Sequence, residues 1–387
     1  MQLHSVKKDE TLYTIARKYS IPATKILADN DLAGDRLTTG DELVILKPTK
    51  TITVKGGDTL DSVSKRFDVR KSAIIRDNPS LFGKDKLRPG QILTIKQDES
   101  KIGVGSVLGY AEKGCRRDKF AKSLPYITYL TISAGIIRNG TVLSTFSATD
   151  VKIKAEKEGK IVVLGIKDES DGEFLSSKEQ YAKVIDDAIN LARLLGFMGI
   201  SISAAKASEI YCEAYCEFLL EVRKRLFGCN MILFTEVFEK THPDASEICD
   251  GAVLNIELSP ISAATDTMRI FSEKAESSKV FIKAVTRSDT PEANISIDEI
   301  KELCYRSGKE LKTDKESLIS YFDYVRYKIG KGEEIRLSFP SLQYIKAKLE
   351  ALCELGFMGI ACDIDTVPLS NLTMFNSMFA RADYSLT

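Results

Sequence analysis

The sequence has no tryptophan, two histidines, no net charge and no apolar run of 18 or more residues among its 387 residues. Without such a run it offers no candidate membrane-spanning helix, and its first residues lack the charged-then-apolar layout of a signal peptide. Because 55 basic side chains are balanced by 55 acidic ones, no basic surface is expected to hold nucleic acid or anionic lipid nonspecifically. We therefore predict neither a nucleic-acid partner nor a membrane partner.

The histidines and cysteines are too scattered to indicate a metal site or a catalytic triad. Cys212 and Cys216 lie four residues apart on a predicted helix, which would supply half of a zinc site, but no nearby cysteine or histidine pair completes it. No Gly-x-Ser-x-Gly motif is present, and His242 precedes a proline in a predicted surface loop. We predict reduced thiols, no metal and no cofactor.

An internal repeat organises the first hundred residues. The composition, 43% hydrophobic and 28% charged, is that of a globular protein, and the length allows two or three domains of roughly 100–200 residues each. Each copy of the repeat reads strand, helix, helix, strand, and Asp58 is the predicted N-cap of the first helix in the second copy. Six positions recur 48 residues later: Val6, Leu12, Ile15, Tyr19, Ile26 and Asn30 correspond to Val54, Leu60, Val63, Phe67, Ile74 and Asn78.

Both copies resemble the LysM module, and we place the two modules at residues 1–47 and 51–96. The family pattern stands in the second copy as 57–60 (Gly-Asp-Thr-Leu), the aromatic Phe67, Asn78 and a closing 90–93 (Gly-Gln-Ile-Leu). The resemblance implies binding of N-acetylglucosamine polymers, peptidoglycan or chitin, in a shallow groove between the Gly-Asp-Thr loop and the loop after the second helix. It assigns these residues to the two grooves: Asp58, Thr59, Leu60, Asn78, Pro79 and Leu81 in the second copy, and Glu10, Thr11, Leu12 and Asn30 in the first.

The first copy departs from the family pattern. Lys8-Asp9-Glu10-Thr11 stands where the second copy has Gly-Gly-Asp-Thr. Loss of glycine removes an easy positive-φ conformation, so we expect the first groove to differ in shape or to bind more weakly. Leu12 and Leu60 are expected to serve the small hydrophobic cores first. Duplication fits weak single sites, because tethered sites gain avidity through effective concentration.

The remainder of the chain has the pattern of a parallel barrel. A polar linker, 97–103, leads into residues 105–387, a length close to the roughly 250 residues of a (β/α)₈ barrel. The tetrapeptide Phe-Met-Gly-Ile at 197–200 recurs at 357–360, so we expect the fourth and eighth strands to begin in the same way. We predict an α/β TIM barrel preceded by two small α+β modules, with eight apolar runs as its strands: 107–111, 127–132, 161–166, 198–202, 231–234, 252–256, 280–285 and 358–362.

Two LysM modules followed by such a barrel resemble the bacterial spore cortex-lytic and spore-coat glycosidases of glycoside hydrolase family 18. The family signature on strand four is Gly-(Phe/Tyr)-Asp-Gly-(Ile/Leu)-x-(Ile/Leu)-Asp-x-Glu, and here Met198, Ser203 and Ala205 stand at its acidic positions. In the family the Glu protonates the leaving oxygen and the Asp orients the substrate's N-acetyl group, which acts as the nucleophile. Because alanine and serine can do neither, we expect an inert barrel. The family's tyrosine after strand six and tryptophan at strand eight are missing as well.

Other carboxylates at the predicted carboxyl ends of the strands leave an enzymatic interpretation open. Glu236 and Glu257 are the candidate substitutes for the lost acid, because two carboxylates about 5–9 Å apart can serve as acid and base. Strand ends and loops are, however, commonly acidic in any barrel. Further carboxylates of this kind are Asp168, Glu169, Glu209, Asp363 and Asp365.

Three functions follow from these observations. The sequence favours a glycan-binding protein of the cell wall or spore envelope, made in the cytoplasm without a signal peptide, whose barrel is a noncatalytic scaffold or a sugar-binding lobe. The second is an active glycoside hydrolase, similar to an N-acetylglucosaminidase, that uses relocated carboxylates. The third is a structural coat component whose barrel binds spore-coat proteins, which an apolar patch across the barrel mouth would favour.

Overall fold

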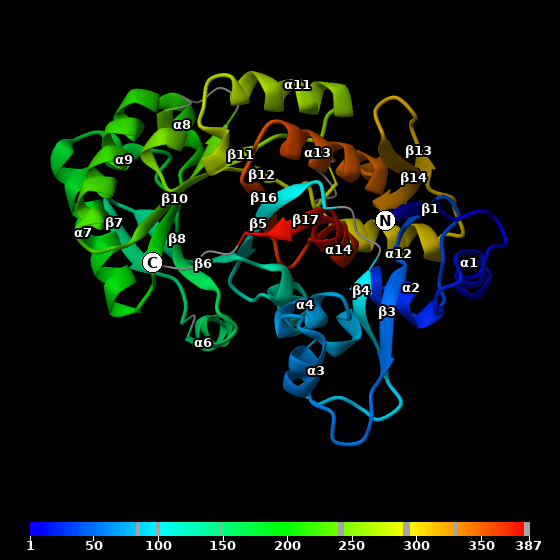
Figure 1. Cartoon of the computed structure of the whole chain (residues 1–387). Helices are drawn as coiled ribbons and strands as arrows, with labels where there is room; N and C mark the ends of the chain where they lie inside the picture. The colour runs from blue at the N-terminus through cyan, green and yellow to red at the C-terminus, as the bar shows by residue number, and fades with distance from the viewer. Residues whose placement is uncertain are drawn as a thin grey trace.

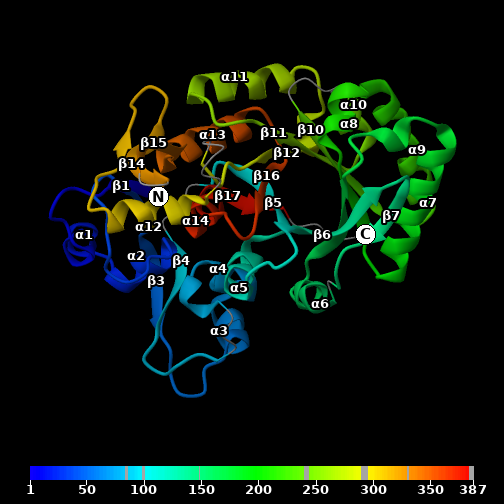
Figure 2. The same ribbon diagram turned by 180° about the vertical axis from the view of Figure 1, so that it is seen from behind.

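The structure, a computed structural model, describes residues 1–82, 86–97, 101–147, 149–238, 244–288, 295–328 and 331–382. Two small modules lie against one flank of a larger barrel, as Figure 1 and Figure 2 show from opposite sides. His242, which the sequence places in a surface loop, lies outside the described residues. Within the described residues, none of the helices is long and apolar enough to cross a membrane.

The first module has the predicted order of strand, helix, helix and strand. Its strands pair antiparallel, and its helices close over a core that includes Leu12, Ile15 and Ile26. Helix α1 begins after Thr11, whose hydroxyl accepts a hydrogen bond from the amide of Thr14. The module contains β1 (Gln2–Ser5), α1 (Leu12–Tyr19), α2 (Ala23–Asp29) and β2 (Glu42–Ile45).

The second module repeats this arrangement and corrects one sequence-based assignment. Asp58 is not the N-cap of α3: Thr59 is, because its hydroxyl accepts the amide of Ser62 at 3.0 Å. The Asp58 carboxylate turns back instead to the amide of Lys55 at 2.8 Å. The module contains β3 (Pro48–Thr53), α3 (Leu60–Phe67), α4 (Lys71–Arg76), the 3₁₀ helix η1 (Pro79–Leu81) and β4 (Ile92–Gln97).

Eight parallel strands close into a barrel, and each predicted apolar run overlaps with one of them. Closure is complete because β5 pairs with both β16 and β6. The barrel prediction is therefore confirmed. In the order of the sheet the strands are β5 (Gly103–Ala111), β16 (Gly359–Asp363), β12 (Val280–Lys283), β11 (Gly251–Asn255), β10 (Ile232–Phe238), β9 (Gly199–Ser203), β8 (Ile161–Asp168) and β6 (Tyr129–Arg138). Two further strands lie beside them, β7 (Thr141–Ser144) on β6 and β17 (Phe379–Arg381) on β5.

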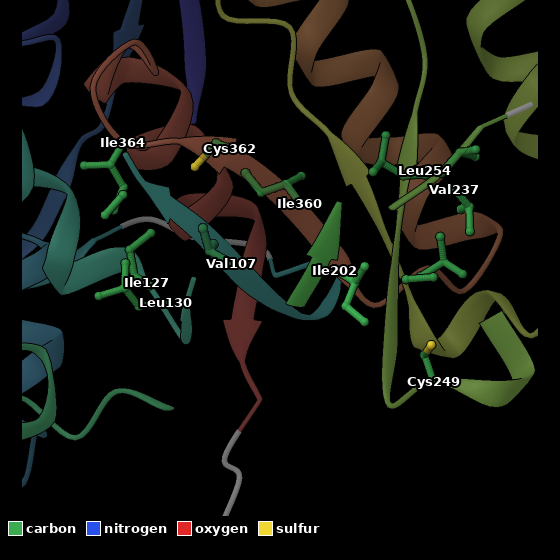
Figure 3. Packing of buried hydrophobic residues seen from close by; sticks show 14 of the residues in the cluster. Val107, Ile127, Leu130, Ile202, Val237, Cys249, Leu254, Ile360, Cys362 and Ile364 are labelled. Atoms are coloured by element: carbon green, nitrogen blue, oxygen red, sulfur yellow. The ribbon is translucent and has the colours of Figure 1, made fainter. Parts of the chain in front are cut away.

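Successive residues of each barrel strand face opposite sides of the sheet. Leu108 belongs to the cluster inside the barrel, where the rings of Tyr129, Phe234 and Phe281 pack edge to face. Its neighbour Val107 belongs to the outer cluster, which fills the space between the strands and the surrounding helices. Figure 3 shows part of this outer cluster. The barrel is therefore filled by side chains, and a ligand must approach one of its two ends.

The recurring tetrapeptide has a steric reason at its glycine. A β-carbon on Gly199 would lie 2.3 Å from the carbonyl oxygen of Ile232, and one on Gly359 would lie 1.9 Å from that of Ser106. Both glycines are the first residues of their strands, so the chain enters β9 and β16 through contacts that only glycine permits.

Helices surround the barrel, and an insertion (295–340) lies between β12 and β16. The insertion has its own core, in which α12 packs against a three-stranded antiparallel sheet. It comprises α12 (Ile297–Arg306), β13 (Lys312–Thr313), β14 (Ile319–Lys328) and β15 (Lys331–Pro340). The remaining helices are α5 (Arg117–Ser123), η2 (Leu124–Tyr126), α6 (Thr149–Lys157), η3 (Glu173–Leu175), α7 (Lys178–Leu194), α8 (Ala205–Ile210), α9 (Cys212–Phe227), α10 (Asp244–Ile248), α11 (Ile261–Ser272), η4 (Ser277–Lys279), α13 (Leu342–Glu354) and α14 (Leu369–Met378).

The first module is fixed to the barrel by buried polar contacts. The Glu42 carboxylate accepts the amides of Leu342 at 2.6 Å and Gln343 at 3.2 Å, which are free donors at the start of α13. A carboxylate at a helix N-terminus also interacts favourably with the helix dipole. On the insertion, the amide of Leu311 donates to the carbonyl of Thr39 at 2.9 Å. These bonds join segments that lie about 300 residues apart.

The second module is held at the same flank. Arg76 donates from Nε to the side chain of Asn376 at 2.9 Å, and its carbonyl accepts the hydroxyl of Tyr126 at 3.1 Å. The ring of Phe82 meets that of Tyr126 edge to face, with centroids 5.6 Å apart. Both modules are thus packed against the barrel through direct side-chain and backbone contacts.

Candidate functional site

The loop before the first helix has a residue with positive φ at the equivalent position of both modules. Gly57 has φ +86°, and Asp9, which replaces it in the first module, has φ +64°. The loss of glycine therefore does not change the turn, although a non-glycine residue in the left-handed region costs roughly 1–2 kcal/mol, less for Asp. The expected difference in shape lies in the side chains at positions 8 and 9, not in the course of the backbone.

A carboxylate fixes this loop in each module. Glu10 and Asp58 each accept, at 2.8 Å, the amide of the residue three positions earlier, Lys7 and Lys55. This backbone hydrogen bond is the main reason why the pKa of both carboxyls is below its usual range. His4 and Arg66 provide second partners, at 2.8 Å from Glu10 and 3.2 Å from Asp58. Both carboxylates are therefore ionised and hold the loop in position.

The asparagines after the second helices are structural parts of each module. Asn78 donates from its amide to the carbonyl of Thr94 at 2.7 Å and accepts the amide of Thr94 at 2.8 Å. Asn30 makes the same pair of bonds with Val44, at 2.9 and 2.7 Å. A third bond from each side-chain NH₂ reaches the preceding helix. These amides position the second loop, and their polar atoms are already in use.

The remaining predicted groove residues differ in their access to solvent. Leu12, Leu60 and Leu81 are buried in the module cores, and Leu60 shares its cluster with Leu81, so both loops of the second groove rest on one core. Thr11 and Thr59 are exposed and cap their helices. Pro79 is half-buried and begins η1. Each groove thus has one exposed threonine among its predicted residues, and the second has a half-buried proline ring as well.

The three positions that the family resemblance expects to be acidic lie at the two ends of one strand, β9. Met198 precedes β9 at its amino end, where its amide donates to the carbonyl of Val162 at 2.9 Å. Ser203 is the last residue of β9, and Ala205 begins α8 and is exposed to solvent. Ser203 and Ala205 therefore occupy the carboxyl end, where active sites of such barrels form, while position 198 lies at the other end.

Glu236 lies at the same end of the barrel, beside a lysine that sequence analysis did not single out. The Glu236 side chain is 10% exposed, and its Oε1 lies 3.4 Å from Nζ of Lys283. Lys283 is the last residue of β12, and its Nζ lies 5.7 Å from the ring centroid of Tyr110. Burial, followed by the charge of Glu236, raises the pKa of Tyr110 well above its usual value. Glu236 thus faces a basic side chain on the neighbouring part of the barrel.

The other predicted carboxylates mainly stabilise the turns in which they lie. Glu257 is exposed after β11. Asp168 accepts the amides of Ser170 at 2.8 Å and Gly172 at 2.7 Å. The rest of the set is distributed as follows: Glu169 pairs with Arg138, Asp363 accepts the amide of Asp365, Asp365 accepts the amide of Arg116, and the side chain of Glu209 lies outside the described part of α8.

Comparison with known proteins identifies the two modules. Residues 4–46 and 52–96 match the profile of the LysM domain. These segments are LysM domains. A stretch of 107 residues is 33% identical to the probable peptidoglycan endopeptidase LytE of Bacillus subtilis. That match covers 24% of this chain and 31% of LytE, so the chain spans about a third of the length of this curated relative.

Solved structures share the fold of the whole chain, LysM domains and barrel together. The spore cortex-lytic enzyme SleL of Bacillus megaterium is 20% identical, with a TM-score of 0.75 over 99% of both chains. SleL of Bacillus cereus is 18% identical, with a TM-score of 0.73 over 98% of this chain and 99% of its own. A chitinase of Chromobacterium violaceum, 11% identical, covers 71% of this chain and 98% of its own, with a TM-score of 0.62. The predicted combination of LysM domains with a glycoside hydrolase family 18-like barrel fold is confirmed.

The structure also shows whether the cysteines form disulfides and whether possible metal ligands lie together. None of the eight cysteines, all of which lie in the described part of the chain, forms a disulfide, and Cys212 and Cys216 lie half-buried on α9. Among the described residues no group of three His, Cys, Asp or Glu side chains is arranged to hold a metal ion. Lys283 was not among the predicted site residues, and its signal in the sequence was a lysine directly after the buried run Val280–Ile282.

Proposed function

We propose that this chain is a glycan-binding protein of the cell wall or spore envelope, in which the LysM domains bind peptidoglycan or chitin and the barrel is a noncatalytic scaffold. The observation that carries the proposal is the matching turn before the first helix of both LysM domains, with positive φ at Asp9 and Gly57. The lack of catalysis is inferred from the family resemblance, which expects the proton donor at position 205, where this chain has alanine. LytE is described as a probable peptidoglycan endopeptidase and SleL as a spore cortex-lytic enzyme, which supports this class of ligand and this setting.

The proposed grooves bind mainly through the backbone. The side-chain amides of Asn30 and Asn78 are bonded to neighbouring strands, and the groove leucines are buried. An N-acetyl group would therefore pair with free backbone groups at the helix ends while its methyl rests on apolar surface such as Pro79. Thr11 and Thr59 are the side chains of the set that remain accessible to a sugar hydroxyl.

Sedimentation with insoluble peptidoglycan and with chitin tests binding directly. The two domains differ at one open position of the loop, Lys8 in the first and Gly56 in the second, and a β-carbon on Gly56 meets nothing within 4 Å. We expect Gly56→Lys to weaken retention by narrowing the second groove, and Lys8→Gly to leave it unchanged or to strengthen it. Wild-type protein that stays in the supernatant with both polymers would contradict the proposal.

Absence of hydrolysis is the second half of the proposal. Ala205 has no proton to give, and Glu236 is paired with Lys283. A positioned general acid contributes about 10²–10⁴ in rate. We expect no released saccharide when the protein is incubated with peptidoglycan fragments or N-acetylated chito-oligosaccharides and the mixture is analysed by mass spectrometry.

A hydrolase with relocated carboxylates is the alternative, and one observation favours it: Glu236 lies nearly buried at the catalytic end of the barrel. In that case Glu236→Gln would abolish product release, while the exposed Glu257→Gln would show whether a second carboxylate takes part. Spore-coat proteins are a further proposed class of partner, which co-sedimentation with coat extracts in the presence and absence of free glycan would test.

A further inference from the structure

A cavity of about 740 Å³ opens where the first LysM domain meets the barrel. Its walls come from three distant segments: the loop 30–43 of the LysM domain, the start of α5 and the insertion helix α12. Figures 1 and 2 show α2 and α12 side by side in both views. This volume falls within the range of about 300–1,000 Å³ that is typical of small-molecule sites.

Ion pairs across the cavity hold its walls in fixed positions. Nζ of Lys119 on α5 lies 2.6 Å from a carboxylate oxygen of Asp298 and 3.8 Å from one of Asp31, so a single ammonium ties three elements together. Lys301 on α12 lies 2.7 Å from Asp41. Although burial opposes the charged form of Lys301, the Asp41 carboxylate raises its pKa. The cavity is therefore formed before any ligand arrives, which lowers the entropic cost of binding.

The chemistry of the lining favours an uncharged polar ligand. Six basic and seven acidic side chains line the cavity, so their charges nearly cancel. A polyanion or polycation would meet as much repulsion as attraction, whereas hydroxyl and amide groups find both donors and acceptors. One aromatic side chain, Tyr305 of α12, lines the cavity and is 40% exposed, with the guanidinium of Arg36 placed 5.7 Å from its ring centroid.

The cavity also connects two regions of the protein. At one side it is bounded by residues 30–33, which belong to the loop that closes the proposed groove of the first LysM domain. At the other side it is bounded by Arg116, whose amide donates at 2.9 Å to Asp365, two residues after β16 ends. It therefore lies between the LysM groove and the carboxyl-end face of the barrel.

We propose that this cavity is a subsite for neutral N-acetylated hexosamine units, through which a glycan bound by the first LysM domain continues toward the barrel. The proposal rests on the proposed glycan-binding function and adds a site that contains residues of both domains. Tyr305 provides a flat apolar face for a pyranose ring, and the charged pairs around it provide hydrogen bonds to hydroxyl and acetamido groups. A short oligosaccharide would fill a LysM groove alone, while a longer one would reach the cavity.

Calorimetric titration of the full chain with N-acetylchitobiose and N-acetylchitohexaose tests this subsite. Wild-type protein is expected to bind the hexaose more tightly than the dimer, and Tyr305→Ala is expected to weaken hexaose binding about 3- to 10-fold, the range for one aromatic contact, with dimer binding unchanged. Phe227→Ala is the matched control, because this 80% exposed aromatic lies on α9, on the flank far from the cavity. It should bind both ligands as wild type does.

Each other outcome is decisive. Equal hexaose affinity in Tyr305→Ala and wild type overturns the subsite and leaves the proposed function intact, as does an equal loss for dimer and hexaose. A wild-type protein that binds neither oligosaccharide overturns the proposed function itself. Hydrogen exchange gives an independent readout: the hexaose should protect residues 30–33 and 297–306 of the wild-type protein, and absence of this protection contradicts the subsite even if Tyr305→Ala binds weakly.

Discussion

Replacing Gly40 or Gly90 with alanine compares two equivalent positions in the two LysM domains. Both glycines have φ +85° and precede the last strand of their domain. A β-carbon on Gly90 meets nothing within 4 Å, whereas one on Gly40 would lie 1.9 Å from the carbonyl oxygen of Leu311 on the insertion. The two substitutions therefore share the same backbone strain, and only the first disturbs the contact with the barrel.

The size of the difference follows from these contacts. Alanine in the left-handed region costs roughly 1–2 kcal/mol at either position. At Gly40 the insertion must in addition move away by more than an ångström. This movement breaks the hydrogen bond from the Leu311 amide to Thr39, a loss of about 1 kcal/mol. It also weakens the Lys301–Asp41 ion pair, a loss of about 1 kcal/mol more. We expect Gly40→Ala to destabilise the joint by about 2 kcal/mol beyond Gly90→Ala, which corresponds to roughly a 30-fold change in the opening equilibrium.

Hydrogen exchange at the Leu311 amide measures this opening, because local openings expose single amides without unfolding the whole chain. Exchange at Leu311 should be roughly 30-fold faster in Gly40→Ala and unchanged in Gly90→Ala. If both variants exchange at the wild-type rate, the first LysM domain does not depend on this contact for its position. If exchange at Leu311 accelerates equally in both variants, backbone strain alone explains the effect, and the contact between Gly40 and Leu311 does not hold the domain to the barrel.

Three further predictions concern the LysM domains and their junctions. Burial raises the pKa of Asp29 from 3.8 to about 6 despite its pairing with Lys25. The unfolded chain therefore loses this proton at a lower pH than the folded chain does. We expect the free energy of unfolding to fall by up to about 3 kcal/mol between pH 4 and 6 and to stay low at pH 7. Denaturant titrations should show this slope in wild type and its loss in Asp29→Asn, and the same slope in both would exclude Asp29 as its source. Glu42→Gln removes the charge that caps α13. It should speed hydrogen exchange in the first turn of α13 about 5- to 30-fold, equivalent to about 1–2 kcal/mol. Glu350→Gln, an exposed change on the same helix, is the control and should leave this exchange unchanged. Asp9→Gly relieves the positive φ and should raise the unfolding free energy by about 0.5–1 kcal/mol, whereas a lower melting temperature would show that the Asp9 side chain stabilises the loop by an interaction of its own.

The fold could be predicted where the signal is local. The repeat at a spacing of 48 residues and the helical and strand periods predicted two modules of strand, helix, helix and strand, which the family resemblance assigned to LysM. The eight apolar runs predicted the barrel strands, because burial on both faces makes such strands continuously apolar. The insertion 295–340 was missed, since its strands are half-exposed and mix polar with apolar residues. The length of the stretch between the seventh and eighth runs was the available signal, because no single crossover needs so many residues.

The site could be predicted only in part, for a related reason. Sequence pattern identifies Asn78 and Asp58 as distinctive residues but does not say whether a polar atom faces a ligand or a neighbouring strand. The contact of Glu42 with α13 joins residues 300 positions apart, and no periodicity encodes such a pairing. The ion pair of Glu236 with Lys283 likewise depends on the tertiary structure, because it joins side chains of β10 and β12, which flank β11 in the barrel.

The Glu42 carboxylate at the start of α13 joins the first LysM domain to the barrel, and this joint affects how the barrel is oriented on a bound polymer. Because this contact fixes the first LysM domain against the barrel, the proposed binding of a glycan by this domain would also set the orientation of the barrel relative to the glycan. Molecules bound in this way to parallel glycan strands would all present the mouth of the barrel at the same angle to the wall.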